Sequence, residues 1–205
     1  MIVVFLGGIG SGKTLSAIRE IRKRKQFVFT NFNIKQIKDY HRIKFTDVII
    51  PGEKKSDYDV NWKFWEKQRS KHDYFSIYLD EVHNIIDARA SNTVINRLMS
   101  KWVSQIRKIT SDTTQNNLFL ISQKIRRIDV NFRELAHVFV ECRKVQTFDK
   151  NDKPVKTFIV QDYFNGIDNY EKDRRACRLA FRAEPYYKYY DTTEMVKFSD
   201  VETYI

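Results

Sequence analysis

Four of the six glycines in this 205-residue chain fall within six positions near its N-terminus. The segment GGIGSGKT, residues 7–14, matches the pattern G-x-x-x-x-G-K-[ST] of a phosphate-binding P-loop. Glycine lets several backbone N–H groups turn towards one phosphate chain. The expected cradle consists of Gly7, Gly8, Ile9, Gly10, Ser11 and Gly12. Lys13 is expected to reach the β- and γ-phosphates of a nucleotide, and the Thr14 hydroxyl is expected to bind Mg²⁺.

The segments on either side of this loop fit the same interpretation. Residues 2–6 (IVVFL) form a short apolar run rich in β-branched side chains, which is typical of a buried parallel strand. Residues 13–25 contain helix formers with Leu15, Ile18 and Ile21 on one face. A glycine-rich turn followed by a chance Lys-Thr is the alternative. The order of strand, loop and helix favours the P-loop, because the positive end of the helix then meets the phosphates.

A second apolar run, FSIYL at residues 75–79, ends in Asp80 and Glu81. An aspartate at the carboxyl end of a neighbouring parallel strand faces the ligand edge of the sheet. Asp80 is therefore expected to hold Mg²⁺ as the Walker B residue, and Glu81 to act as general base on the attacking water. The alternative is an acidic helix start, which also favours Asp and Glu. The P-loop nearby favours the catalytic interpretation.

A third apolar run, residues 118–122, ends in Gln123. A polar side chain at this position can contact the γ-phosphate or the water, or it can simply be a solvated strand end. The residues alone do not separate these two interpretations.

Alternating strands and helices predict an α/β fold with a central, mostly parallel sheet flanked by helices. Strands are expected at 2–6, 27–30, 74–80, 117–122 and 137–142, and helices at 13–25 and 92–110. Residues 1–142 would form the core domain, with 31–73 as an insertion between core strands. Residues 143–205 would form a small β-rich appendage packed on the core, with a hairpin around 145–160, a strand at 178–182 and a short helix near 192–198.

The long helix is expected to pack through a stripe of apolar side chains. The stripe consists of Val94, Leu98, Trp102, Ile106 and Ile109, widened by Met99 and Val103.

Composition narrows the possible classes of protein. The formal net charge is +11, which favours a polyanionic partner such as nucleic acid. Residues 19–45 include nine basic and two acidic side chains, and residues 101–133 include seven basic and two acidic ones. No apolar run approaches the roughly 18 residues of a membrane span. Two cysteines, Cys142 and Cys177, provide no disulfide framework or zinc spacing, which suits a reducing compartment.

Several motifs together resemble one superfamily. GGIGSGKT, IYLDEVHN, SQIRK, LFLISQ with the basic stretch after it, and IDVNFRELA resemble the FtsK/HerA superfamily of DNA-pumping ATPases. Within it the chain is similar to two branches: the genome-packaging ATPases of tailless, membrane-containing double-stranded DNA viruses, and the Zot-like assembly ATPases of filamentous phages. The likeness covers about residues 1–140, and the segment from Tyr190 to Glu194 is also similar to such viral ATPases.

The resemblance implies ATP and Mg²⁺ as cofactors, Asp80 as Walker B residue, Glu81 as catalytic base and Gln123 as the polar sensor at a strand end. It implies a homo-oligomeric ring, a pentamer or hexamer, in which an arginine from one subunit completes the site of the next. Arg107, just before the Gln123 strand, is the first candidate. The alternatives are Arg126, Arg127 and Arg133.

The implied partners are double-stranded DNA, contacted through its backbone, and a capsid or capsid-vertex protein. The expected location is the host cytoplasm or the virion vertex. The Zot-like branch is associated with a membrane span after the ATPase domain, and since this sequence has none, packaging of a viral genome is the preferred function. The alternatives are Zot-like virion extrusion, a small-molecule kinase for nucleosides or nucleotides, and a P-loop protein that only binds. The Asp80–Glu81 pair suits activation of water better than binding of a phosphate acceptor.

Overall fold

The computed structural model describes residues 1–52, 57–84, 93–109 and 117–191, without the side chains of His83 and residues 107–109. In these ranges the strands are β1 (Ile2–Leu6), β2 (Phe27–Thr30), β3 (Tyr40–Arg42), β4 (Ile49–Pro51), β5 (Tyr58–Val60), β6 (Phe75–Leu79), β7 (Asn117–Ile121), β8 (Val138–Phe148), β9 (Pro154–Asn165) and β10 (Cys177–Arg182). The α-helices are α1 (Lys13–Arg24), α2 (Phe45–Val48), α3 (Trp62–Lys71), α4 (Val94–Ile109), α5 (Val130–Leu135), α6 (Gly166–Glu171) and α7 (Glu184–Tyr187). Short 3₁₀ turns lie at Val82–Asn84 and Ile125–Arg127.

An eight-stranded sheet with the order β10-β9-β8-β1-β7-β6-β2-β3 forms the centre of the fold. The strands from β8 to β3 in this order run parallel, and β9 runs antiparallel to both β8 and β10. The predicted α/β fold with a mostly parallel sheet is therefore confirmed. The expected strands at 2–6, 27–30, 74–80 and 117–122 correspond to β1, β2, β6 and β7 within one residue at each end.

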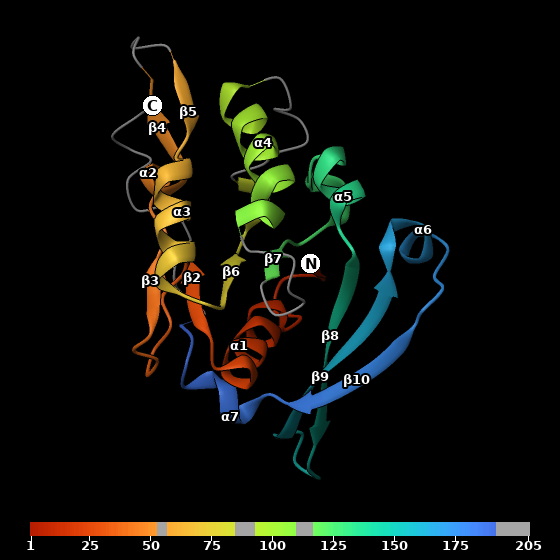
Figure 1. Cartoon of the computed structure of the whole chain (residues 1–205). Coiled ribbons are helices and arrows are strands. Elements are labelled where there is room, and N and C mark those ends of the chain that lie inside the picture. Colours follow the sequence, from red (N-terminus) through yellow and green to blue (C-terminus); the bar gives the residue numbers. More distant parts are fainter. Residues whose placement is uncertain (53–56, 85–92, 110–116, 192–205) are drawn as a thin grey trace.

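Helices cover both faces of this sheet, as Figure 1 shows. Side chains of α3, α4 and α5 pack with Ile2, Val4 and Leu6 of β1 on one face, and α1 packs with Val3 and Phe5 on the other. Both sides of β1 are thus buried, which explains why its sequence is apolar without alternation. The central strands are held rigidly between two cores, so the loops at their ends have a fixed frame.

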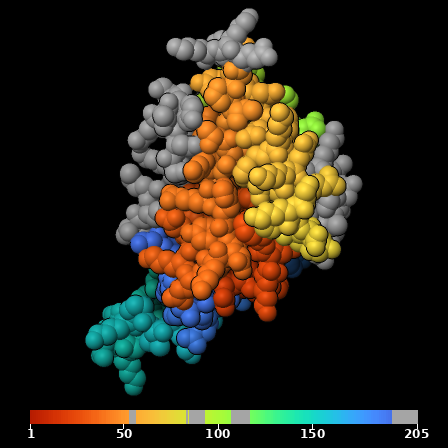
Figure 2. Space-filling model, turned by 60° about the vertical axis from the view of Figure 1, so that its left-hand side comes forward, coloured from red at the N-terminus to blue at the C-terminus, as the bar shows by residue number. Residues whose placement is uncertain are grey.

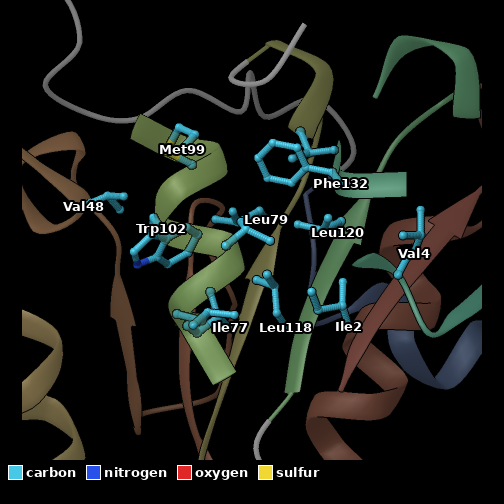
Figure 3. Packing of buried hydrophobic residues seen from close by; sticks show 14 of the residues in the cluster. Ile2, Val4, Val48, Ile77, Leu79, Met99, Trp102, Leu118, Leu120 and Phe132 are labelled. Carbon is cyan, nitrogen blue, oxygen red and sulfur yellow. The ribbon is translucent and has the colours of Figure 1, made fainter. Parts of the chain in front are cut away.

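Helix α4 packs on the middle strands, where Trp102 and Met99 lie on the side of Leu79, and Leu120 lies beyond it near Phe132 (Figure 3). The predicted stripe is only partly correct. Trp102, Ile106, Met99 and Val103 are buried, but Val94 is 42% exposed. Ile109 has its side chain outside the described part. Leu98 is partly buried and packs against the same core, and in the first turn Ile95 and Asn96, not Val94, face it.

The segment between β2 and β6 has more structure than the sequence predicted. β3 extends the main sheet beside β2, and β4 pairs with β5 in a separate two-stranded ribbon. Helix α3 places Trp65 completely inside the core, within 5.3 Å of the ring centroid of Trp102. Aromatic packing, which has no simple period in the sequence, organises this segment.

Strand β8 differs most from the prediction. It is one continuous strand from Val138 to Phe148, although two separate strands were expected at 137–142 and 145–148. Its partner on the other side is β9, and β10 then adds to β9, so all three belong to the central sheet. The tip of the β8–β9 hairpin projects away from the rest of the molecule, in teal in Figure 2. The helix expected near 192–198 lies outside the described residues.

Candidate nucleotide site

The loop between β1 and α1 has a backbone that requires glycine at two positions. Gly7 has φ 141° and Gly12 has φ 92°, both in the region that side chains rarely adopt. A Cβ at Gly7 would lie 2.5 Å from the carbonyl oxygen of Cys142, and a Cβ at Gly12 would collide with the Ile159 side chain. Strands β8 and β9 therefore hold the loop tightly from one side. Ile9 at the tip of the loop is 90% exposed.

Lys13 begins α1 directly after this loop. Its side chain is only 7% exposed, and its ammonium donates a 2.9 Å hydrogen bond to the Gly8 carbonyl. Among the described residues no side chain caps the N-terminus of α1. The first N–H groups of the helix and the Lys13 ammonium thus lie on the same small cavity, an arrangement that suits an anion.

The side chains of Thr14 and Asp80 are in contact at the carboxyl edge of the sheet. The Thr14 hydroxyl donates a 2.6 Å hydrogen bond to Oδ2 of Asp80, and the backbone N–H of Glu81 donates a 2.7 Å bond to Oδ1. Asp80 is 2% exposed, and burial raises the pKa of its carboxyl to about 6, although the bonds from Thr14 and Glu81 act against this rise. A deeply buried carboxylate beside a hydroxyl is poorly solvated, and a cation bound there would stabilise it.

These two oxygen groups are the expected metal ligands, and their chemistry fits Mg²⁺. Hydroxyl and carboxylate oxygens are hard donors of the type that Mg²⁺ prefers, and Mg²⁺ in such sites keeps waters and phosphate oxygens as its other ligands. Among the described residues no three His, Cys, Asp or Glu side chains gather into a metal cage. The remaining ligands of a metal at Thr14 and Asp80 would then be waters or oxygens of a bound nucleotide.

The sequence analysis assumed that the strand carrying Asp80 is the direct neighbour of β1, and the structure differs. β7 lies between β1 and β6. Asp80 still reaches Thr14 because Asn31, after β2, fixes the end of β6 from the other side. The Asn31 amide donates to the Asp80 carbonyl at 2.9 Å and accepts from the Asp80 N–H at 2.7 Å. Asn31 is 1% exposed, and sequence reasoning missed it because no motif marks it.

Glu81 and Gln123 follow the neighbouring strands β6 and β7, each two residues after the strand ends, and line the same cavity as Lys13 and Thr14. Glu81 has φ 47°, a left-handed conformation that a non-glycine residue seldom adopts. Backbone strain of this type is common at functional sites. The structure thus brings together Lys13, Thr14, Asp80, Glu81 and Gln123, as the sequence suggested.

The cavity has a volume of about 420 Å³ and a second wall that sequence reasoning missed. Lys144 of β8, Ile159 of β9, Tyr187 of α7 and Tyr190 form it. The only sequence signal was the clustering of tyrosines around 186–190. Strand pairing across the β8–β9 hairpin, which brings Lys144 opposite Ile159, could not be derived from that signal.

Three of the four candidate arginines lie outside the described lining of the cavity. Arg107 belongs to α4, but its side chain is outside the described part. Arg126 and Arg127 lie on the 3₁₀ turn after β7, where Arg126 is exposed and Arg127 half-buried, and Arg133 is half-buried in α5. The described lining of the cavity contains no arginine.

A separate arginine cluster surrounds Asp162 on β9. Arg178 binds it through two hydrogen bonds, of 2.6 and 3.0 Å, and Arg143 and Arg175 add bonds of 2.6 and 3.3 Å. The Arg178 bonds, followed by that of Arg143, hold the pKa of the Asp162 carboxyl below its usual value although burial acts against them. This cluster ties β8, β9 and β10 together.

In the described part of the chain, no helix has the length and apolar character needed to cross a membrane. No curated protein sequence matches the chain.

Comparison with solved structures finds one similar fold and a second, weaker likeness. The N-terminal domain of zonular occludens toxin from Neisseria meningitidis is 17% identical, with a TM-score of 0.57, and the match covers 93% of this chain and 98% of that one. The genome packaging NTPase B204 from Sulfolobus turreted icosahedral virus 2, in complex with ATP-gammaS, is 13% identical with a TM-score of 0.45, and covers 80% of this chain and 92% of that one.

The family model that describes zonular occludens toxin (Zot) matches residues 1–192, nearly the whole chain. This match includes the loop at residues 7–14, Asp80, Glu81, Gln123 and the second wall of the cavity. The chain belongs to the zonular occludens toxin (Zot) family.

Proposed function

We propose that this chain is an ATP-hydrolysing motor that moves DNA during the assembly of a virus particle. The observation that carries the proposal is the 2.6 Å hydrogen bond from Thr14 to Asp80 beside the P-loop. It brings together the two oxygen groups that would hold Mg²⁺, with Lys13 and Glu81 on the same cavity. These are the groups that hydrolysis of a nucleoside triphosphate requires.

Each side chain has a separate task in this chemistry. Lys13 and the N-terminus of α1 would bind the phosphates, while Thr14 and Asp80 would hold Mg²⁺, which neutralises charge on the phosphate oxygens. Glu81 would orient a water and accept its proton as the water oxygen bonds to the γ-phosphorus and the bond to the β-phosphate oxygen breaks. Gln123 would hydrogen-bond the γ-phosphate or that water.

The proposal includes a homo-oligomeric ring. The described cavity lining contains lysines but no arginine, and in the proposed ring an arginine from a neighbouring subunit would add its charge to the transition state. Arg107 is the first candidate and Arg126, Arg127 and Arg133 are the alternatives. An arginine that acts in the next subunit should be dispensable for nucleotide binding but needed for hydrolysis in the assembled ring.

The proposed DNA contacts are to the phosphate backbone. The net charge of +11 favours a polyanion, and Lys124 and Arg126 are exposed just after β7, at the edge of the sheet where the nucleotide site lies. Double-stranded DNA is the proposed partner. Movement of this edge during hydrolysis would then be transmitted directly to the DNA.

Membership of the Zot family favours virion assembly of the Zot-like type over packaging into a capsid. The sequence-based preference for packaging depended on the lack of a membrane span, and the family match outweighs it. Packaging of double-stranded DNA, with a capsid or vertex protein as partner, is the alternative within the same class of motor.

Phosphate release from ATP, with and without double-stranded DNA and with a panel of nucleosides, tests the proposal. DNA is expected to stimulate hydrolysis. Phosphorylation of a nucleoside would instead identify a kinase, and ATP hydrolysis that no DNA alters would contradict the DNA motor.

A matched pair of variants locates the DNA contact. The double variant Lys124→Ala/Arg126→Ala should lose DNA stimulation, and the salt dependence of its DNA binding should become weaker. Loss of basal hydrolysis as well would identify Arg126 as the arginine that completes the site of the next subunit. The control is Lys63→Ala/Lys67→Ala, which removes two exposed lysines from α3. If both double variants lose stimulation equally, the contact is only general charge attraction and the surface after β7 has no special role.

A further inference from the structure

The cavity beside the P-loop has two ends, and the residues that form them follow or belong to strands on opposite sides of β1. Glu81 and Gln123 follow β6 and β7, on one side of β1, whereas Lys144 and Ile159 belong to β8 and β9, on the other side. A triphosphate bound by residues 7–14 with its γ-phosphate towards Glu81 must therefore extend its other end towards β8 and β9. The residues at that end lie where a ribose and a base would be.

Strand β8 continues beyond the end of β1 and so forms a side wall. Leu6, the last residue of β1, pairs with Glu141, and the remaining residues of β8 pass beside the P-loop. Ile159 lies opposite Lys144 in the hairpin and packs in the same core as Leu15 of α1. This places an apolar surface next to the first turn of α1, immediately beside the phosphate cradle.

Helix α7 and the residues after it close the slot with tyrosine rings. Tyr187 is 43% exposed and Tyr190 is half-buried, and both line the cavity. The Tyr190 ring packs edge-on against Phe32 with centroids 5.9 Å apart. Tyr187 is thus a partly exposed residue of the cavity wall, while Tyr190 is held in place by a core residue.

The position of this wall is fixed by several bonds. Glu184 accepts a 2.5 Å hydrogen bond from the Thr157 N–H, and the Ala183 N–H donates to the Thr157 carbonyl at 2.9 Å. At the other end the Lys35 N–H donates to the Tyr189 carbonyl at 2.9 Å, and the Arg22 guanidinium lies 4.7 Å from the Tyr189 ring centroid. A preorganised aromatic wall binds a planar ligand with little loss of entropy.

We propose that Tyr187 is the stacking platform for the nucleobase, with Ile159 and Tyr190 as the other walls of the slot and Lys144 beside the sugar-phosphate end. This assignment rests on the proposed function, because it deepens the same nucleotide site. It gives residues 143–191 a direct part in binding the substrate. Stacking recognises the flat face that every base has, so the slot is expected to discriminate weakly between adenine and other bases.

The test compares a nucleotide with its phosphates alone. Calorimetry would measure the binding of a non-hydrolysable ATP analogue and of inorganic tripolyphosphate, both with Mg²⁺, to the full chain. Tyr187→Ala should weaken binding of the analogue about 10- to 100-fold and leave tripolyphosphate binding unchanged. Tyr187→Phe should keep binding of the analogue within about threefold, because the ring face remains. Analogues of GTP and CTP should bind within about tenfold of the ATP analogue.

Tyr74→Ala serves as the matched control, because Tyr74 is 45% exposed and lies before β6, at the other edge of the sheet. Equal weakening of both ligands by Tyr187→Ala, or no weakening of either, would overturn the stacking role. Wild-type protein that binds tripolyphosphate as tightly as the ATP analogue would also overturn it while leaving the P-loop assignment intact. Binding of neither ligand would instead refute the proposed function. A preference of more than about 100-fold for adenine would contradict recognition by stacking.

Discussion

The Thr14 hydroxyl and the Asp80 carboxylate are 66 positions apart in the sequence and 2.6 Å apart in the structure. One belongs to the first turn of α1 and the other to the end of β6, with β7 between β1 and β6. Their contact links the loop that binds phosphate to the strand that carries the acidic pair. The proposed chemistry therefore depends on the precise position of the end of β6.

Asp80→Asn should impair metal binding without destabilising the fold. The asparagine oxygen can accept from the Glu81 N–H, and its NH₂ group can donate to the Thr14 hydroxyl, so both local contacts survive the substitution. We expect Mg²⁺-dependent phosphate release to fall about 100-fold or more. Because burial raises the pKa of Asp80 to about 6, the charged form opposes folding at pH 7, and the variant should unfold at an equal or higher temperature. A large fall in the unfolding temperature would contradict this account.

Asn31→Ala should loosen the end of β6. It removes both hydrogen bonds that Asn31 makes to the Asp80 backbone, which is buried. Since each of the two unsatisfied buried groups costs about 1–3 kcal/mol, the free energy of unfolding should fall by about 2–6 kcal/mol. Denaturant titration measures this loss. The control Asn33→Ala, at an exposed residue that accepts a bond from Arg42, should change stability by less than about 0.5 kcal/mol.

Gly12→Ala and Gly8→Ala should differ sharply in stability. Gly12 has φ 92° and no room for a Cβ beside Ile159, whereas no atom lies within 4 Å of a Cβ built on Gly8. Backbone strain and the clash together should cost about 2 kcal/mol or more for Gly12→Ala, which lowers the melting temperature by about 4–8 °C. Gly8→Ala should melt within about 1–2 °C of the wild type. Similar melting temperatures for the two variants would show that β9 does not press on the loop.

Asp162→Asn should show a stability defect that depends on pH. The arginines around Asp162 lower the pKa of its carboxyl in the folded state, so the ionised form stabilises the fold. That contribution is fully present above the unfolded pKa of about 3.9 and is lost as pH falls through the lower folded value. Unfolding measured at pH 7, 5 and 3 should give a clear difference from the wild type at pH 7 and 5 and a smaller one at pH 3. A difference that does not change with pH would point to packing instead of charge.

The sequence predicted the central strands and the phosphate loop well because both have short-range signals. The glycines of residues 7–14 and the apolar runs before Asp80 and Gln123 are each visible within a few residues. The order of the strands was not visible, since it depends on pairings between distant segments, and so β7 was not expected between β1 and β6. For the same reason the roles of Asn31 and Ile159 were missed.

The tyrosines that line the cavity show a different limit of prediction from the sequence. Tyr187 and Tyr190 lie more than 170 positions from the P-loop. Long-range contacts bring them to it, among them the bonds of α7 to Thr157 of β9 and that of Lys35 to Tyr189. No motif in the sequence indicated which aromatic residues would lie at the cavity. The β8–β9 hairpin sets that choice through its register with β1.

The most direct measurement is steady-state phosphate release from ATP and Mg²⁺ by the wild type, Lys13→Ala and Glu81→Gln, together with ATP binding. The wild type should hydrolyse ATP, Lys13→Ala should lose binding or turnover, and Glu81→Gln should bind ATP but release phosphate at least about 100-fold more slowly. Hydrolysis at the wild-type rate in both variants would contradict the assignment of residues 7–14 and 80–81 as a nucleotide-hydrolysing site.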